Sequence, residues 1–274
     1  MSWSFRYHIV LALTLALSAP VLGQTPSTSV ELTREQKEEF LRTASIGKSK
    51  KLSVGITDSR RATLTDGSIT HDAHIQTVEV FKFRHLTEVG FTDSYRYNIA
   101  AYRLDKILGL GMVPVSVERK VGGKKASLTW WIDDAWMTEK ERISKGARAP
   151  DVDLWNKQMY RTRVLDQLIY NMDRNLGNLV ITRDWKIWAI DHTRAFRTHK
   201  VLKSKKDLVQ CDRRLLAALR GLTDKTLTGE LRPYLSKSQI KGLLARRDLI
   251  VEYFDNAVAE KGEQAVLYDL PPRL

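Results

Sequence analysis

The periodicity of apolar residues changes once along this chain, and that change limits the folds it can adopt. Residues 52–84 and 113–132 are rich in β-branched residues or alternate between apolar and polar ones, which is typical of strands. One amphipathic segment, 93–109, interrupts them, with Gly109 where a helix would end. From Asp151 onward, apolar residues recur mainly at helical spacing. The pattern therefore predicts an α+β fold with a mostly-β first part and a mostly-α second part.

Local signals place the ends of several elements. Thr33 precedes a short helical segment and Gln36 follows three residues later, which is the pattern of an N-terminal helix cap. Gly122-Gly123 separates two strand-like runs and indicates a tight β-hairpin. Ser236 or Ser238 is placed to cap a long helix near the end of the chain. These signals support a small sheet with one helix, followed by a mainly helical remainder.

The composition limits the class of protein. The chain has 274 residues, of which 43% are hydrophobic and 28% charged, so it is globular and forms one large domain or two small lobes. The single cysteine, Cys211, excludes a disulfide scaffold and any metal site built from several cysteines. His71 and His74 lack a third ligand at a metal-binding spacing, so a turn leading into a strand is the preferred interpretation there. No Walker-type phosphate loop is present, which argues against that class of ATPase.

The N-terminus has the pattern of a secretory signal peptide. A start with one arginine and no acidic residue precedes an almost wholly apolar run, residues 9–19, and small or aliphatic residues stand before Gln24. The run is short of the roughly 20 apolar residues of a transmembrane helix, and an uncleaved anchor is the alternative. No other stretch is long enough to span a bilayer. We therefore expect an exported protein, periplasmic or secreted, with no integral membrane span after signal cleavage.

Residues 165–196 hold the densest set of side chains suited to chemistry. Asp173 opens a loop after an expected helix, Asn178 lies five residues further, and Asp191 ends an expected short hairpin. A helix–loop–hairpin path can return the end of its second strand to the start of the loop, so the three side chains could converge. Phosphoryl transfer needs a carboxylate for the attacking hydroxyl, and an amide plus a second carboxylate for magnesium. Such loops are also common without this role, so the spacing alone leaves the function open.

Two blocks of sequence match the motifs of a known family. Asn171-Met172-Asp173-Arg174 matches a catalytic loop, and Asp191–Phe196 is loosely similar to the metal motif that follows it. Upstream, Ile99–Gly109 and then Val113-Pro114 match a helix-C region. In these blocks the chain resembles the atypical secretory-pathway kinases of the Golgi casein kinase and four-jointed type. More distantly it resembles phosphatidylinositol 3- and 4-kinases and HipA-type kinases.

The resemblance implies a two-lobed, protein-kinase-like fold that uses ATP with Mg²⁺ or Mn²⁺. By that resemblance Asp173 would be the catalytic carboxylate, Asp191 the main metal ligand and Asn178 the second metal ligand. The expected organisation is a signal peptide at 1–23, a linker and short helix at 24–50, an N-lobe at 51–134 and a C-lobe at 135–274.

The nucleotide contacts are less well matched. Lys82 would contact the phosphates, with Arg84 as a nearby substitute, although a solvated lysine on an edge strand is the other interpretation of Lys82. The candidate phosphate loop, residues 55–61, has a single glycine, so Ser59 and Arg60 would assist its backbone N–H groups.

One position departs from the family pattern. Asn98 stands where the family has the helix-C glutamate that holds the phosphate-binding lysine. An amide cannot form that ion pair, although it can hydrogen-bond an ammonium or a metal-bound water. Either Glu79 or Asp93 replaces the missing acid, or nucleotide binding is altered. A nucleotide-binding pseudokinase without catalysis is therefore the first alternative function.

The excess of basic residues suggests a second alternative function. The net charge is +13, and residues 203–248 hold twelve Lys and Arg against five Asp and Glu. Such a face could bind acidic proteins, lipid headgroups or sulfated glycans as a basic module for acidic polymers, or it could be a solvated helix surface. The export signal and the lack of a known binding motif argue against nucleic acid. If the chain is a kinase, its acceptor is a hydroxyl on a protein, sugar or lipid headgroup, and the sequence does not choose among them.

Overall fold

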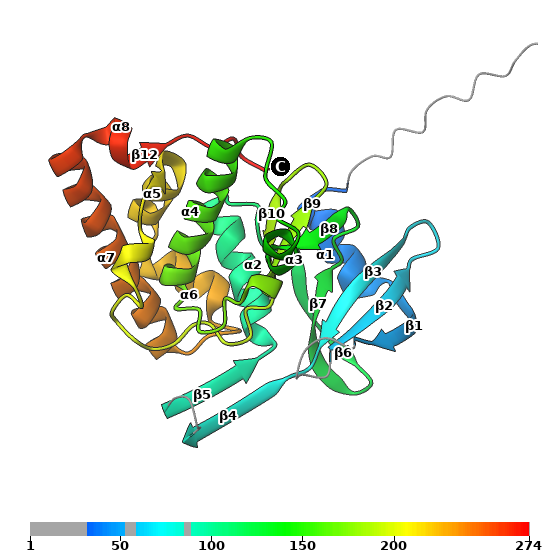
Figure 1. The fold of residues 1–274 in the computed structure, drawn as a ribbon. Coiled ribbons are helices and arrows are strands. Elements are labelled where there is room, and N and C mark those ends of the chain that lie inside the picture. Colours follow the sequence, from blue (N-terminus) through cyan, green and yellow to red (C-terminus); the bar gives the residue numbers. More distant parts are fainter. Residues whose placement is uncertain (1–31, 53–58, 85–88, 274) are drawn as a thin grey trace, which may run out of the picture. The chain divides into compact units, whose positions relative to one another are not determined.

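The computed structural model describes residues 32–52, 59–84 and 89–273. Thr33–Leu274 forms one compact unit (Figure 1). The expected signal peptide, and Gly55 of the candidate phosphate loop, lie outside the described residues. In the part of the chain that is described, no helix has the length and apolar character needed to cross a bilayer.

A five-stranded antiparallel sheet forms the first part of this unit. Its strand order is β1-β2-β3-β7-β6. The strands are β1 (Ser45–Lys51), β2 (Ser59–Thr65), β3 (Thr70–Gln76), β6 (Ser116–Val121) and β7 (Lys124–Trp130). The β6–β7 hairpin turns at Gly122 and Gly123, both with positive φ, as the sequence predicts. The sheet begins earlier than predicted, because β1 is an exposed edge strand whose side chains show no apolar alternation.

Two helices pack against β6 and β7 of this sheet, α1 (Arg34–Thr43) and α2 (Arg96–Leu108). Helix α1 begins with the predicted capping box of Thr33 and Gln36. Its buried Glu38 accepts a hydrogen bond from the Tyr102 hydroxyl (2.8 Å), which joins α1 to α2. Helix α2 ends at Gly109, whose φ of 66° is the left-handed conformation expected of a glycine C-cap.

A separate hairpin leaves the sheet between β3 and α2. It consists of β4 (Glu79–Arg84) and β5 (Val89–Ser94), which pair only with each other among the described strands. Figure 1 shows it extending away from the five-stranded sheet. Within the strand-like stretch 52–84, residues 74–83 contain no turn signal and read as one strand, whereas the structure ends β3 at Gln76 and starts β4 at Glu79. At the base of the hairpin, the Ser94 N–H donates to the Thr193 carbonyl (2.9 Å).

The second part is mainly helical. A three-stranded sheet of order β10-β9-β8 opens it, with β8 (Ala135–Thr138), β9 (Leu179–Thr182) and β10 (Ile187–Ala189). The helices are α3 (Glu139–Ser144), α4 (Val152–Leu168), α5 (Arg213–Gly221), α6 (Asp224–Leu231), α7 (Lys237–Lys261) and α8 (Glu263–Val266). Short 3₁₀ turns at η1 (Leu176–Asn178) and η2 (Lys205–Asp207), and a parallel pair of β11 (Cys211–Asp212) with β12 (Leu267–Tyr268), complete it. Ser236 caps α7, which packs against α4, α5 and α6.

One hydrophobic core runs through both parts. Leu64 and Leu128 of the sheet belong to the same buried cluster as Leu165 of α4 and Ile250 of α7. The boundary expected between residues 134 and 135 falls in the connection from β7 to β8. The two parts are therefore held together by shared apolar burial as well as by this connection.

A buried carboxylate fixes the chain where α2 turns back toward β6. Asp105, wholly buried, accepts hydrogen bonds from the N–H groups of Gly111 (3.0 Å), Met112 (2.8 Å) and Val113 (3.1 Å). Three donors on one carboxylate satisfy backbone groups that would otherwise be buried without partners. This turn places Val113 and Pro114 beside a cavity between the two parts of the fold.

Candidate functional site

A cavity of about 430 Å³ is lined by residues from both parts of the fold. Its apolar lining includes Val113, Pro114, Trp130, Ile132, Val180 and Ala189. Its polar lining includes Asp93, Asn98, Asp173, Asn178, Asp191 and Arg194. An apolar wall facing a few convergent polar groups is the usual lining of a small-molecule site.

The loop after α4 presents Asp173 to this cavity. Tyr170 takes up a left-handed conformation (φ 50°) shortly after the helix ends, so the chain turns sharply there. The Asn171 side chain donates to Asp166 Oδ1 (3.0 Å) and accepts the Asp173 N–H (3.0 Å). The Asp173 side chain is 40% exposed, so an incoming molecule can reach its carboxylate.

Arg174 ties the same loop to the end of β10. Its guanidinium pairs with the buried Asp166 (Nε to Oδ2, 2.9 Å). It also donates to the backbone carbonyls of Asn178 (2.9 Å) and Ile190 (2.9 Å). Its Nη2 lies 3.0 Å from Nε2 of His192. Burial, and then the charge of Arg174, lower the pKa of His192 well below its ordinary value, so the ring is neutral and Nε2 accepts.

Asp191 follows β10 in a strained backbone conformation. Its φ of 50° is uncommon for a residue with a Cβ, and such strain is found most often at functional sites. The Thr193 hydroxyl donates to Asp191 Oδ1 (3.0 Å), and the Asn178 amide donates to the Asp173 carbonyl (3.0 Å). Asp173, Asn178 and Asp191, which the sequence singles out, therefore line one cavity and are each held by a neighbour.

The oxygen atoms of this site fit a hard divalent cation. In the described part of the chain, no cluster of three or more His, Cys, Asp and Glu is placed to hold a metal ion. Mg²⁺ does not need one, because it binds through one or two protein oxygens, keeps several waters and adds substrate phosphates. The carboxylate of Asp191 and the amide oxygen of Asn178 are ligands of that kind.

Comparison with known proteins finds similarity in structure but not in sequence. No protein-family model and no curated protein matches the sequence. Hydra Fam20, solved with a sugar, matches with 14% identity over 86% of this chain and 92% of that one, at a TM-score of 0.66. Golgi casein kinase matches with 15% identity over 87% of this chain and 80% of that one, at 0.60. The Helicobacter pylori proinflammatory kinase CtkA matches with 12% identity over 81% and 98%, at 0.51.

The chain has a protein-kinase-like fold. The two-lobed α+β architecture that the resemblance implies is thereby confirmed, and Golgi casein kinase, the type named from the two sequence blocks, is among the structural neighbours. At these identities the likeness concerns the fold alone. Helix α2 contains most of the block Ile99–Gly109 that resembles the helix-C region of that family, and it is called helix C below.

A neutral pair of amides links β3 to helix C. In protein kinases a lysine of the third strand pairs with a glutamate of this helix. Here the Asn98 Nδ2 donates to Gln76 Oε1 at the end of β3 (2.7 Å). The Asn98 Oδ1 accepts the N–H of His192, next to Asp191 (2.8 Å). Both amides are buried, with Asn98 6% exposed, so their hydrogen bonds fix helix C to the sheet and to the metal motif without any charge.

Glu79 and Asp93 were the two acids considered as substitutes for the missing glutamate. Among the described hydrogen bonds, neither of them contacts Gln76. Glu79 accepts a hydrogen bond from the Ser94 hydroxyl (3.1 Å), on the hairpin. Asp93 lines the cavity and pairs with Arg194 (Nε to Oδ2, 3.0 Å). The side chain on β3 that Asn98 contacts, Gln76, is neutral as well.

Ser59 and Asn98, which the sequence predicts near the nucleotide, line the cavity with Asp173, Asn178 and Asp191. Ser59 is buried at the start of β2. Five of the seven predicted site residues thus come together, although they are spread from residue 59 to residue 191 of the sequence.

Lys82 and Arg60 do not line the cavity, and this corrects the placement predicted for them. Lys82 is exposed on β4, in the hairpin that leaves the sheet. Arg60 is exposed on β2 and donates to the Ser49 hydroxyl (3.0 Å). Lys82 lies outside the cavity because the chain breaks between β3 and β4. Lys82 would be part of the third strand of the sheet only if that strand continued past Gln76. The side chain of Arg84 lies outside the described residues.

Sequence reasoning also missed contributors to the site. Gln76 gave no signal, since a glutamine in a strand has no special pattern. Arg174 belongs to the matched motif, but its ion pair with Asp166 was not predicted. The one available signal was an acidic residue, Asp166, about one helix turn before the loop. Arg194 lay within the loosely matched metal motif but carried no role there.

Proposed function

We propose that this chain is an exported kinase that transfers the γ-phosphate of ATP to a hydroxyl on a protein, sugar or lipid headgroup. The observation that carries the proposal is the meeting of Asp173, Asn178 and Asp191 in one cavity of a kinase-like fold. Two structural neighbours are named as kinases, and a third was solved with a sugar. These names support the reaction class and leave the acceptor open.

The apolar lining of the cavity suits the nucleobase. Val113, Trp130 and Ile132 offer flat, water-excluding surface at the junction of the two lobes. A nucleobase is largely apolar on its faces, so burying it there is favourable and directs the phosphates to the polar lining.

The polar lining supplies the groups that phosphoryl transfer needs. Asp173 orients the attacking hydroxyl and accepts its proton on a carboxylate oxygen. Asp191 and Asn178 would hold Mg²⁺ or Mn²⁺, which when bound neutralises charge on the phosphates. Arg174 and the neutral ring of His192 act through position, because they hold the loop of Asp173 against the end of β10.

Nucleotide binding and label transfer test the proposal together. Unfolding temperature should rise with ATP and Mg²⁺ or Mn²⁺ in the wild type and not in Asp191→Ala. Transfer of labelled phosphate should be lost in Asp173→Asn. Asp153→Asn, an exposed carboxylate on α4 outside the cavity, is the matched control and should behave as wild type. No response of the wild type to any nucleotide would refute the proposal.

A nucleotide-binding pseudokinase is the second candidate, and the neutral pair of Gln76 and Asn98 favours it. Kinases position the α- and β-phosphates with the lysine that this pair lacks. Metal-dependent binding of ATP, with no label transfer to any protein, sugar or lipid acceptor, would select this candidate.

The basic module has less support from the structure. Several cations of residues 203–248 are engaged within the fold: Arg213 pairs with Glu263, and Arg220 with Asp255. Arg246 is wholly buried and donates to backbone carbonyls. Salt-sensitive binding of an anionic polymer that survives Asp191→Ala would revive this alternative.

Export is part of the proposal and has its own test. The signal pattern predicts cleavage before Gln24. Sequencing the N-terminus of the protein recovered outside the cytoplasm should therefore begin at Gln24, and retention of the first residues would contradict cleavage.

A further inference from the structure

The described lining of the cavity has more negative than positive side chains, although a nucleotide is itself negatively charged. Among the described lining residues, Asp93, Asp173 and Asp191 are carboxylates, and Arg194 is the one Lys or Arg. Phosphates carry several negative charges, and bringing them near three carboxylates is unfavourable without cations. A divalent metal at Asp191 offsets part of this repulsion, which leaves Arg194 as the protein's own cation for the rest.

Other candidates for this role fail on position or charge. Gln76, which faces helix C from β3, is a neutral amide. His74 lines the cavity, but burial lowers its pKa against the opposing charge of Asp191, so its ring is neutral near pH 7. Lys82 lies outside the cavity, on the exposed hairpin.

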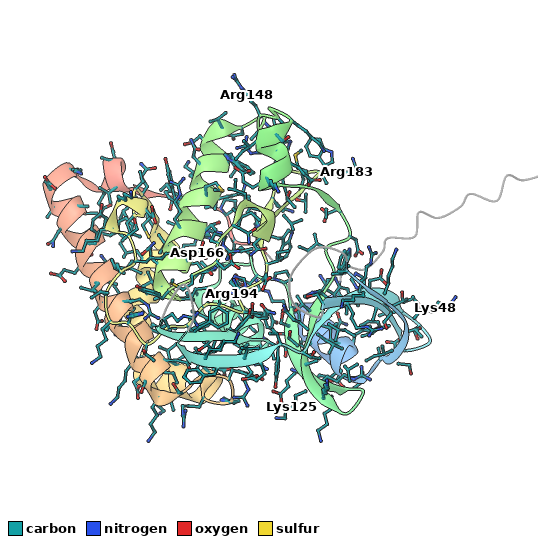
Figure 2. The ribbon with its side chains drawn as sticks, turned by 60° about the horizontal axis from the view of Figure 1, so that its bottom comes forward. Lys48, Lys125, Arg148, Asp166, Arg183 and Arg194 are labelled. Carbon is teal, nitrogen blue, oxygen red and sulfur yellow. The ribbon has the colours of Figure 1, made fainter. Side chains whose placement is uncertain are left out.

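Arg194 is anchored at one end of its guanidinium and reachable at the other. Its Nε bonds to the buried Asp93 (3.0 Å), and its guanidinium lies over the Phe91 ring (5.3 Å to the ring centre). Its Nη1 makes a longer contact with Asp173 (3.3 Å). The Arg194 side chain is 28% exposed, and Figure 2 shows it in the interior of the view, between the hairpin and α4.

We propose that Arg194 contacts the phosphates of the nucleotide, in the role that a lysine of the third strand has in other kinases. The anchor on Asp93 fixes the side chain while the outer nitrogens remain available as a fork of donors. A guanidinium fork suits two phosphate oxygens, and charge-assisted bonds of this kind are strong. The inference rests on the proposed kinase function, since it names the phosphate contact of that same site.

The same geometry gives Arg194 a second effect on Asp173. An ion pair between partly exposed groups, such as that of Arg194 with Asp173, is weak. A phosphate oxygen at Arg194 would replace the carboxylate of Asp173 as the acceptor of Nη1. Asp173 would then be released to accept a hydrogen bond from the attacking hydroxyl, so nucleotide binding prepares the acceptor site.

Affinity measured for two ligands tests this assignment. Titration calorimetry with Mg²⁺ compares ATP and adenosine on the wild type, Arg194→Met and Arg194→Lys. We expect Arg194→Met to bind ATP about 10- to 100-fold more weakly, the worth of charge-assisted hydrogen bonds, with adenosine affinity unchanged. Arg194→Lys keeps the charge and should recover part of the loss. Arg183→Met is the control and should match wild type, because Arg183 is exposed, lies at the edge of the protein in Figure 2 and does not line the cavity.

The outcomes separate this inference from the proposed function. Equal ATP affinity in wild type and Arg194→Met, with label transfer intact in the wild type, overturns the role of Arg194 alone. Equal losses for ATP and adenosine also overturn it, because they indicate a merely structural side chain. If the wild type binds no nucleotide, the kinase proposal fails and this inference with it. Arg194→Lys decides the matter if Arg194→Met does not fold.

Discussion

The neutral pair of Gln76 and Asn98 makes a specific prediction about stability. Converting it to the charged pair of other kinases, with Gln76→Lys and Asn98→Glu together, should be tolerated far better than either change alone. Asn98 is 6% exposed and Gln76 1%, and their amides meet at 2.7 Å, so each single variant buries one charge opposite a neutral group. The double variant gives each charge its partner.

The magnitudes follow from burial. Leaving one charge of a buried pair uncompensated costs about 3–5 kcal/mol, so each single variant should lose about 3 kcal/mol of unfolding free energy. Independent effects would then sum to about 6 kcal/mol in the double variant. Pairing the two charges should recover at least about 2 kcal/mol of that sum, within the range measured for residues in contact.

Urea unfolding of the four proteins at one pH closes the double-mutant cycle. Asn98→Glu combined with Ser49→Lys, an exposed position on β1, is the control and should be additive to within about 0.5 kcal/mol. An additive result for positions 76 and 98 would refute the reasoning, because it would mean that the two side chains do not face each other.

Three further predictions concern the site. Asp173→Asn should reduce label transfer about 10²- to 10⁴-fold, the usual worth of a general base, while ATP affinity measured by calorimetry stays within about threefold. Arg174→Met should lower the unfolding free energy, measured in urea, by about 3 kcal/mol, because it leaves the buried carboxylate of Asp166 without its cation. A loss below about 1 kcal/mol would contradict an ion pair between these two side chains. Because the pKa of His192 is lowered in the folded protein, the unfolded chain binds its proton first. Stability should be full above pH about 6.5 and fall by up to about 1.4 kcal/mol per pH unit below it, and His192→Gln should flatten that slope.

The fold was predictable where the sequence carries local signals. The capping box at Thr33, the hairpin at Gly122-Gly123 and the end of α2 at Gly109 follow from turn and cap chemistry, which acts over a few residues. Asp173 and Asp191 were predictable as a pair, because a helix, a short loop and a hairpin leave few paths for the chain.

The parts that were not predicted depend on contacts between distant residues. No Gly, Pro, Asn or Asp stands between Gln76 and Glu79, so nothing local marks the point where the chain leaves the sheet. For that reason the sequence does not show that Lys82 lies on the hairpin, outside the cavity lining. The pairing of Asn98 with Gln76 and the anchoring of Arg194 arise only when helix C, the sheet and the metal motif are assembled.

The tethering of helix C bears on how such a protein could be controlled. Many kinases are turned off by swinging this helix outward, which breaks its ion pair with the sheet. Here Asn98 bonds to Gln76 (2.7 Å) and to the backbone of His192 (2.8 Å), with Ser127 at 3.5 Å. Such neutral, buried bonds respond little to ionic strength or to a nearby phosphorylated residue. Moving the helix outward would break these buried bonds together, so we expect charge-based regulators to shift it little.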